Sequence, residues 1–298
     1  MRVLVTGGSG FVGKPLVSEL EQNHEVYSAD VAPDVGNATK SIELDITDSY
    51  QVDKVVSTIK PEVIFHLAAK VSFRWSLEEP RKDLLLHALG TINVLEAARK
   101  IKSYPHIIFA GSSAIFGNPK IVPTPEDCPT NPTSPYGVSK LAGEKYCELY
   151  KDVYGLPYTI LRFTNIYGPN SGKGVVAAFS KNALSGKPIT IFGGDQEIQF
   201  VHIRDVIRAY KVAMDKKVTG TFNIGGPDVI TLKGLAELII KESGNSIPLE
   251  IKPPVEGDIK QTIFDISKAG EKLNWRPEVS IKEGIRDFVE FLRVREKT

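Results

Sequence analysis

The chain has 298 residues, of which 42% are hydrophobic, and its 37 basic and 36 acidic residues give a net charge of +1. This length predicts one large unit that carries a second, smaller lobe. The balanced charge provides no broad field to attract nucleic acid or an anionic membrane surface, and no segment reaches the roughly 18 apolar residues of a membrane helix. We therefore expect a cytoplasmic protein without nucleic-acid or membrane partners.

The two cysteines, Cys128 and Cys147, are too few to form a disulfide framework. Neither has a second Cys or a His at the spacing that metal ligands need. Buried or loop thiols are the simpler interpretation of both residues. No metal site is expected.

From the N-terminus to Asn165, short apolar runs alternate with segments of helical periodicity. Strands are expected at "RVLVTG", "HEVYSAD", "EVIFHLAA", "HIIFAGSS" and "YTILRFTN". Helices are expected at "FVGKPLVSELEQ", "VDKVVSTI", "LGTINVLEAARK" and the segment that contains Tyr136. Continuous apolar runs between helices are typical of parallel strands buried on both faces. The predicted class is α/β, a doubly wound parallel sheet of the Rossmann type with a smaller C-terminal lobe.

After Asn165 the sequence becomes rich in turn residues, as in "YGPNSGKG" and "LSGKPITIFGGDQ". We expect residues 1–168 to form the main domain, to which the chain returns at about 200–226. Residues 169–199 and 227–298 would form the lobe. The last helix places one apolar stripe on its core side, made of Ile281, Ile285, Phe288 and Leu292.

The segment "TGGSGFVG" joins the first strand to the first helix and carries glycines at positions 7, 8, 10 and 13. Such glycines allow a sharp turn, close approach of backbone N–H groups to a pyrophosphate, and tight packing of helix on strand. A mere turn is the alternative, but Asp30 follows at the end of the second strand. That carboxylate can bind ribose hydroxyls and would repel a 2′-phosphate. NAD, and not NADP, is the predicted cofactor.

Two further features allow more than one interpretation. In "LDITD", Asp45 and Ile46 either grip an adenine or belong to a helix cap. In "SPYGVSKLAGE", Tyr136 and Lys140 are four positions apart, which is one helical turn. Taken alone, they are either a solvated surface pair or a phenol beside an activating ammonium.

Motifs along nearly the whole chain resemble those of the extended short-chain dehydrogenases, the NAD-dependent epimerase/dehydratase family. They include "VTGGSGFVG", "HLAAK", "SSAIFG", "SPYGVSKLAGE", "LRFTNIYGP" and "FVHIRDV". The sugar-nucleotide 4-epimerases of the family are most similar. By this resemblance, the cofactor contacts are Gly7, Gly10, Phe11, Val12, Gly13, Asp30, Asp45, Ile46, Leu67, Ala68, Ala69, Lys70, Tyr136 and Lys140. The catalytic residues are Ser112, Tyr136 and Lys140, and the substrate contacts are Ser112, Ser113, Tyr136 and Asn165.

The resemblance implies epimerisation of a nucleotide sugar at C4 through a transient 4-keto intermediate. Tyr136 would be the base, with its pKa lowered by Lys140 and by oxidised NAD, and Ser112 would orient the reacting hydroxyl. Ser113-Ala114 stands where a 4,6-dehydratase has Asp-Glu, and "SSAIFG" lacks the cysteine of a 3,5-epimerase. An NAD-dependent reductase or dehydrogenase of a related sugar or small alcohol remains an alternative. A regulator that has lost the chemistry is a second one, against which the intact Tyr136 and Lys140 argue.

The sequence departs from the family pattern on the substrate side. His87 replaces an asparagine near the nicotinamide, and either donates a hydrogen bond there or is simply packed. Arginines that bind the diphosphate are missing near Ile198 and Val255. Lys173, Arg204, Lys252 and Lys260 are either replacement cations or solvated surface residues. A homodimer is expected, paired through the helices after Leu84 and after Tyr136.

Overall fold

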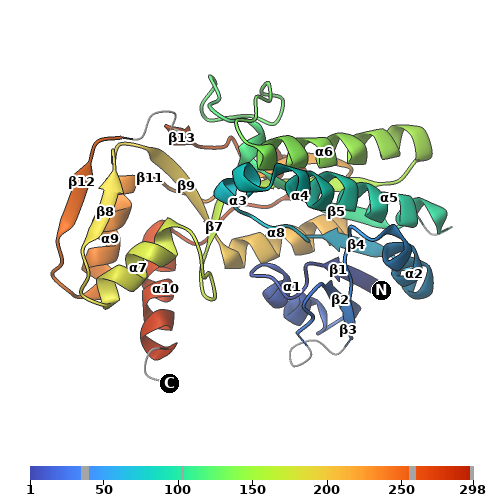
Figure 1. Ribbon diagram of the computed structural model, residues 1–298, viewed down its shortest axis with the longest axis horizontal. Helices are drawn as coiled ribbons and strands as arrows, with labels where there is room; N and C mark the ends of the chain where they lie inside the picture. Colours follow the sequence, from blue (N-terminus) through green and yellow to red (C-terminus); the bar gives the residue numbers. More distant parts are fainter. Residues whose placement is uncertain (35–39, 102–103, 255–259, 296–298) are drawn as a thin grey trace.

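The computed structural model describes residues 1–34, 40–101, 104–254 and 260–295, and its centre is a seven-stranded parallel sheet (Figure 1). The strand order is β10-β6-β5-β4-β1-β2-β3. The strands are β1 (Arg2–Thr6), β2 (Glu25–Asp30), β3 (Ser41–Glu43), β4 (Val63–His66), β5 (His106–Ser112), β6 (Tyr158–Phe163) and β10 (Gly220–Ile224). Because the chain runs outward from β1 first to one edge and then to the other, the sheet is doubly wound. The predicted fold class is confirmed.

Helices cover both faces of this sheet, which explains why its central strands are largely apolar, whereas the edge strand β3 is only partly buried. Val3 and Val5 of β1 face the core under α1 (Gly13–Leu20) and α8 (Ile203–Lys216). Leu4, between them, faces the core under α2 (Ser49–Ile59), α5 (Gly90–Lys100) and α6 (Pro135–Tyr154). Alternate side chains thus fill opposite cores, and a charge in either position would be buried.

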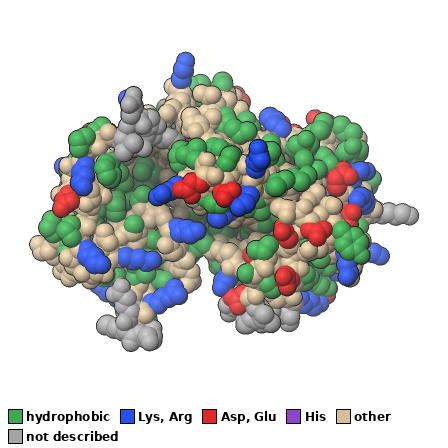
Figure 2. Space-filling view, viewed as in Figure 1, with side chains coloured by type: hydrophobic (Ala, Val, Ile, Leu, Met, Phe, Trp, Pro, Cys, Tyr) green, Lys and Arg blue, Asp and Glu red, His purple; other side chains and the backbone are tan. Residues whose placement is uncertain are grey.

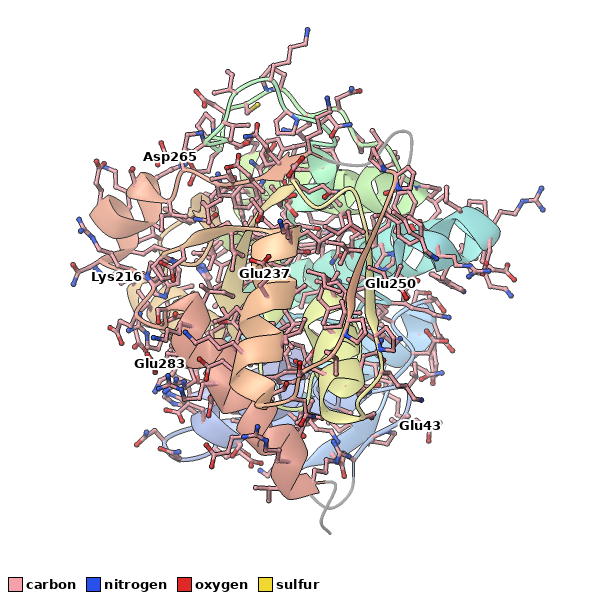
Figure 3. All side chains as sticks on the ribbon, turned by 90° about the vertical axis from the view of Figure 1, so that its left-hand side faces the viewer. Glu43, Lys216, Glu237, Glu250, Asp265 and Glu283 are labelled. Carbon is pink, nitrogen blue, oxygen red and sulfur yellow. The ribbon has the colours of Figure 1, made fainter. Side chains whose placement is uncertain are left out.

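The lobe has a hydrophobic core of its own, beside the C-terminal edge of the sheet (Figure 1). It contains α7 (Val175–Leu184), α9 (Leu232–Ser243), α10 (Ile281–Arg295), β8 (Ile189–Phe192) and β12 (Leu249–Lys252). Figure 3 looks onto this lobe and shows the three helices side by side, with Glu237 and Glu250 labelled on its elements. The predicted stripe of α10 is confirmed as core at Ile285, Phe288 and Leu292.

Short elements connect the lobe to the sheet. They are β7 (Asn165–Tyr167), β9 (Glu197–His202), β11 (Val229–Thr231) and β13 (Gln261–Thr262), which pair around β9. The π-turn η3 (Ala269–Leu273) and Trp275 pack into the core beneath the main sheet. The chain therefore crosses between the two parts more than once after residue 227, and segments distant in sequence meet at the junction.

Four short elements near the C-terminal edge of the sheet complete the fold. They are α3 (Phe73–Glu78), α4 (Pro80–Leu84), the π-turn η1 (Leu85–Leu89) and the 3-10 turn η2 (Ser113–Ile115). None of the described helices is long and apolar enough to cross a membrane. Within the same described ranges, no three His, Cys, Asp or Glu side chains gather as metal ligands.

Candidate active site

The glycine turn after β1 is shaped by contacts that exclude side chains. Gly7 has φ +74°, and a Cβ there would lie 2.7 Å from the backbone nitrogen of Ala68. A Cβ on Gly13 would overlap the carbonyl oxygen of Gly7, so helix α1 could not pack as closely. At Gly10 a Cβ would meet only the Gly7 oxygen, at 3.1 Å, and the residue is exposed. The inner side of the turn, at Gly7 and Gly13, therefore has no room for a side chain, while Gly10 faces solvent. This shape fits a pyrophosphate at the start of α1.

Asp30 ends β2 beside this turn. Its carboxylate accepts hydrogen bonds from the backbone N–H groups of Ser9 (3.1 Å) and Ala32 (3.3 Å). These bonds fix the carboxylate while leaving the residue partly exposed. Its position and charge fit ribose hydroxyls better than a ribose phosphate. The assignment of Asp30 to the cofactor stays a prediction.

Asp45 and Ile46 lie in the turn that follows β3. Asp45 Oδ1 accepts from both the backbone N–H and the hydroxyl of Thr47, each at 2.8 Å. Asp48, and not Asp45, caps helix α2. The side chain of Ile46 is buried in the core against Gly90, so a contact with an adenine would have to use its backbone.

The segment 67–70 follows β4 and runs beside the glycine turn. Leu67 donates its N–H to Thr6 (3.0 Å), and Ala68 packs against Gly7. Ala69 is partly exposed, while the Lys70 ammonium lies 4.2 Å from the centre of the Trp75 ring. Phe11 and Val12, at the start of α1, pack partly against the core of the sheet. These placements are compatible with cofactor contacts, which remain predictions.

Tyr136 lies in the first turn of α6, where the chain is held in place by caps. Ser134 accepts from the N–H of Gly137 (3.1 Å), Pro135 occupies the first turn, and Gly155 ends the helix in the left-handed conformation. The Tyr136 side chain is buried, and burial raises its pKa to about 12 although the Ser112 hydroxyl acts in the opposite direction. Burial thus outweighs the other influences on Tyr136 in the protein alone, and the lowering expected from Lys140 together with oxidised NAD stays a prediction.

Lys140 is one turn further along α6 and is also buried. Its ammonium donates to the carbonyl of Ala110 (2.9 Å) and lies over the Phe109 ring. Burial lowers the Lys140 pKa to about 8, while the Glu144 carboxylate raises it. Glu144 pairs in turn with Arg162, whose Nη2 lies 2.8 Å from Glu144 Oε2, and both side chains are nearly inaccessible. The charge on Lys140 thus depends on a buried ion pair beneath it.

Ser112 and Tyr136 meet at a pocket of ≈ 270 Å³ between the sheet and the lobe. Asn165 and Ser113 line the same pocket, which places the four predicted substrate contacts together. Among the described residues, its lining is uncharged and rich in hydroxyl and amide groups: Ser72, Ser112, Ser113, Thr124, Ser134, Tyr136, Asn165, Gln261 and Thr262. The roles predicted for Ser112, Ser113 and Asn165 are not tested by this placement.

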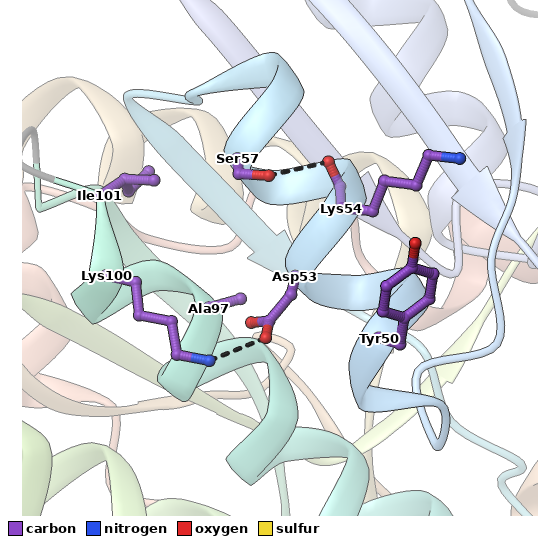
Figure 4. Close-up of a pocket in the computed structure, with 7 residues that line it drawn as sticks. All are labelled: Tyr50, Asp53, Lys54, Ser57, Ala97, Lys100 and Ile101. Atoms are coloured by element: carbon purple, nitrogen blue, oxygen red, sulfur yellow. Dashed lines mark hydrogen bonds and ion pairs between the residues drawn. The ribbon is translucent and has the colours of Figure 1, made fainter.

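The surface is hollowed between the two parts of the molecule, and basic side chains gather on the lobe (Figure 2). A second hollow of ≈ 380 Å³ lies between α2 and α5, on the outer side of the sheet domain (Figure 4). Its wall includes the ion pair between Lys100 and Asp53 (2.7 Å). None of the predicted site residues lines this second hollow.

The structure locates most of the residues at which the sequence departs from the family pattern on the substrate side. Ile198 packs against the core of the lobe, whereas Val255 falls outside the described residues. Arg204, on α8, pairs across to Glu283 on the lobe (2.7 Å), and Lys252 lies over the Phe192 ring on the lobe itself. Lys173 and Lys260 are exposed.

The profile of the NAD dependent epimerase/dehydratase family matches residues 3–225. The chain belongs to this family. A UDP-glucose 4-epimerase from Mycolicibacterium smegmatis is 36% identical to it, over 98% of this chain and 99% of the relative. A UDP-glucose 4-epimerase from Thermotoga maritima, solved with UDP-glucose, has a TM-score of 0.93 and 36% identity, covering 99% of this chain and 100% of that chain.

A third similar protein is named for another sugar. It is a UDP-glucuronic acid 4-epimerase from Bacillus cereus, solved with UDP-glucuronic acid and NAD, with a TM-score of 0.90 and 31% identity. The match covers 99% of this chain and 100% of that chain. The resemblance predicted from the motifs is confirmed, while the sugar differs among relatives of similar likeness.

Sequence reasoning missed four residues of this family site. Glu144 and Arg162 lie inside recognised motifs, and a buried charge at helical spacing from Lys140 was the signal available for Glu144. Gln261 and Thr262 line the pocket from β13. No local pattern marks them, because they reach the site only through pairing of β13 with β9.

Proposed function

We propose that this protein is an NAD-dependent 4-epimerase of a UDP-sugar. The observation that carries the proposal is the meeting of Ser112 and Tyr136 at an uncharged, hydroxyl-lined pocket. Hydroxyl and amide side chains can both donate and accept, as the hydroxyl groups of a sugar require. The similar proteins named for UDP-glucose and UDP-glucuronic acid epimerisation support the same reaction.

The residues present fit NAD. The open glycine turn would hold the pyrophosphate, Asp30 the adenosine ribose, and Lys140 the nicotinamide ribose. When bound, NAD supplies a reversible acceptor for the hydride from C4 of the sugar. We assign the cofactor to residues 1–168 with the return at 200–226, and substrate binding to the lobe segments 169–199 and 227–298, of which η3 and Trp275 pack back against the main sheet.

Tyr136 would take the proton from the C4 hydroxyl and later return one, while Ser112 orients the same oxygen. Because burial holds the Tyr136 pKa at about 12, the phenol needs nearby positive charge to act as a base near neutral pH. Lys140 is placed on the next turn of α6 to supply part of it.

The test is incubation of the purified protein with separate UDP-sugars, followed by chromatography of the products. We expect interconversion of a pair that differs at C4, without added cofactor and without net formation of NADH. Stoichiometric NADH formation or consumption would instead identify the reductase or dehydrogenase alternative. Absence of turnover with every UDP-sugar would refute the proposal.

We also propose a homodimer formed through α4, η1 and α6. These neighbouring elements expose apolar side chains that a monomer leaves in water: Leu84, Leu85, Leu89, Val138, Leu149 and Val153. Light scattering should give twice the chain mass. Leu149→Glu should shift the protein toward the monomer. A monomer mass for both the parent protein and Leu149→Glu would contradict the dimer.

A further inference from the structure

A buried acid and a buried histidine lie behind Tyr136, outside the residues assigned to the reaction. Asp83 belongs to the last turn of α4 and His87 to the π-turn η1. Asp83 Oδ2 is 3.1 Å from His87 Nδ1, and neither side chain is accessible to solvent. Among the described residues, neither oxygen of the Asp83 carboxylate has a hydrogen-bond partner, so the contact with His87 is close but is not aligned as a hydrogen bond. A π-turn inside a helix frequently marks a functional position.

The second nitrogen of His87 fixes how this pair is arranged. His87 Nε2 accepts from the backbone N–H of Lys70 (3.1 Å), so the proton of the neutral ring is on Nδ1 and points to Asp83. Nε2 is thereby hydrogen-bonded within the protein, and Nδ1 lies close to the Asp83 carboxylate. Of the two interpretations from the sequence, this geometry favours a packed histidine over a donor to nicotinamide.

The His87 ring also contacts the catalytic phenol. It meets the Tyr136 ring edge to face, with centroids 5.1 Å apart and an interplanar angle of 86°. One side chain therefore joins the cofactor segment 67–70 to the base on α6. Its carbonyl is held as well, because Thr91 Oγ1 donates to it at 2.5 Å.

We propose that Asp83 and His87 are positioning residues for the epimerase reaction. The pair fixes the position of Lys70 relative to Tyr136 and places a carboxylate behind the phenol. This inference rests on the proposed function for its kinetic consequences. It predicts that the charge and the hydrogen bonds of the pair have separable effects.

The charge acts within a defined set of neighbours. Three groups interact electrostatically with His87: Lys140 on α6, His66 on β4 and Asp83 on α4. Two further groups interact with Tyr136: Tyr210 on α8 and the hydroxyl of Ser112 on β5. Burial and Lys140 lower the pKa of His87 to about 4, so the ring is neutral near pH 7. The Asp83 carboxylate opposes formation of the phenolate and favours the ammonium of Lys140.

Asp83→Asn removes the charge and retains an oxygen that can accept from Nδ1–H. Without the negative charge the pKa of both Tyr136 and Lys140 falls. Both limbs of the pH profile of kcat should therefore move to lower pH, while bound NAD and Tm stay near those of the parent protein. An unmoved profile contradicts the assigned charge effect.

His87→Phe keeps a ring against Tyr136 but removes the hydrogen bond from Lys70 and the contact with Asp83. Because loss of alignment near a reacting group costs up to about 100-fold, kcat should fall by about 10-fold to 100-fold, and less NAD should remain after gel filtration. The matched control is His106→Asn. His106 is equally buried and bonds Thr159 (2.7 Å), but it begins β5, roughly 20 Å from Ser112 at a rise of about 3.3 Å per residue.

The control should lower Tm without moving the pH profile or NAD retention. If Asp83→Asn and His87→Phe also change only Tm, the pair is structural and the inference is overturned. If the parent protein retains NAD but converts no UDP-sugar, the proposed function fails. In that event, unchanged NAD retention in His87→Phe would still overturn the positioning of Lys70.

Discussion

The two sides of the site are built differently. On the cofactor side, the backbone of Gly7 to Gly13 and the end of β2 define the shape, and consecutive β-α units deliver them. On the substrate side, side chains from β5, β7, β13, α3, α6, η2 and the loops beside them converge on one pocket. The glycine turn works only where side chains are absent, whereas the pocket depends on the side chains that are present. We therefore expect cofactor binding to be lost when atoms are added to the turn, and substrate binding to weaken when atoms are removed from the pocket.

Gly13→Val is the strongest test of the cofactor side. The new side chain would overlap the backbone of Gly7 and Gly8, which cannot move without opening the turn. We expect loss of bound NAD and of all epimerase activity, measured by NAD content after denaturation. Gly172→Ala is the control, because its Cβ would meet nothing within 4 Å. Retention of NAD by Gly13→Val would show that the turn is not the cofactor site.

Much of the cofactor side could be predicted from sequence for this reason. Each glycine lies within a few residues of the strand and helix that need it, so the pattern is local. The order of apolar runs also predicted most of the sheet, since its central strands are buried on both faces, whereas β3 at one edge has no buried residue. Gln261 and Thr262 could not be predicted, because their position depends on a chain crossing almost 100 residues after Asn165. The burial that raises the Tyr136 pKa is likewise a property of packing and not of spacing.

Tyr136→Phe removes the base while leaving the ring against His87. General acid–base catalysis contributes about 10²-fold to 10⁴-fold, so kcat should fall by about 10³-fold with bound NAD retained. Tyr150→Phe is the matched control on the same helix, since its hydroxyl bonds Glu96 away from the pocket. Equal activity of the two variants would remove Tyr136 from the reaction.

Glu144→Gln tests the buried ion pair between Glu144 on α6 and Arg162 on β6, which lies beside Lys140. Arg162 would keep a buried charge without its partner, and breaking such a pair costs about 3–5 kcal/mol of unfolding free energy. Lys140, with a pKa of about 8, is charged below that pH and neutral above it. Because Glu144 raises this pKa, its loss should move the alkaline limb of the activity profile to lower pH.

Urea unfolding and a pH profile measure these two effects. Glu148→Gln, one turn along α6, breaks only a surface pair with Lys145 and should change either quantity little. A Glu144→Gln protein as stable as Glu148→Gln would contradict the buried pair. An unmoved alkaline limb would show that the charge of Lys140 does not limit activity.

Thr262→Ala should have the smallest effect and probes the substrate side alone. One neutral hydrogen bond contributes about 0.5–1.5 kcal/mol, so KM for the UDP-sugar should rise by roughly 2-fold to 10-fold with kcat and NAD content unchanged. Thr190→Ala is the control, because that hydroxyl bonds Glu250 on the outer strand pair of the lobe. If both variants raise KM equally, the lobe acts through its stability and Thr262 is not a substrate contact. If only Thr262→Ala does, the β13 crossing supplies part of the sugar site, and differences among relatives that prefer different sugars should be sought there.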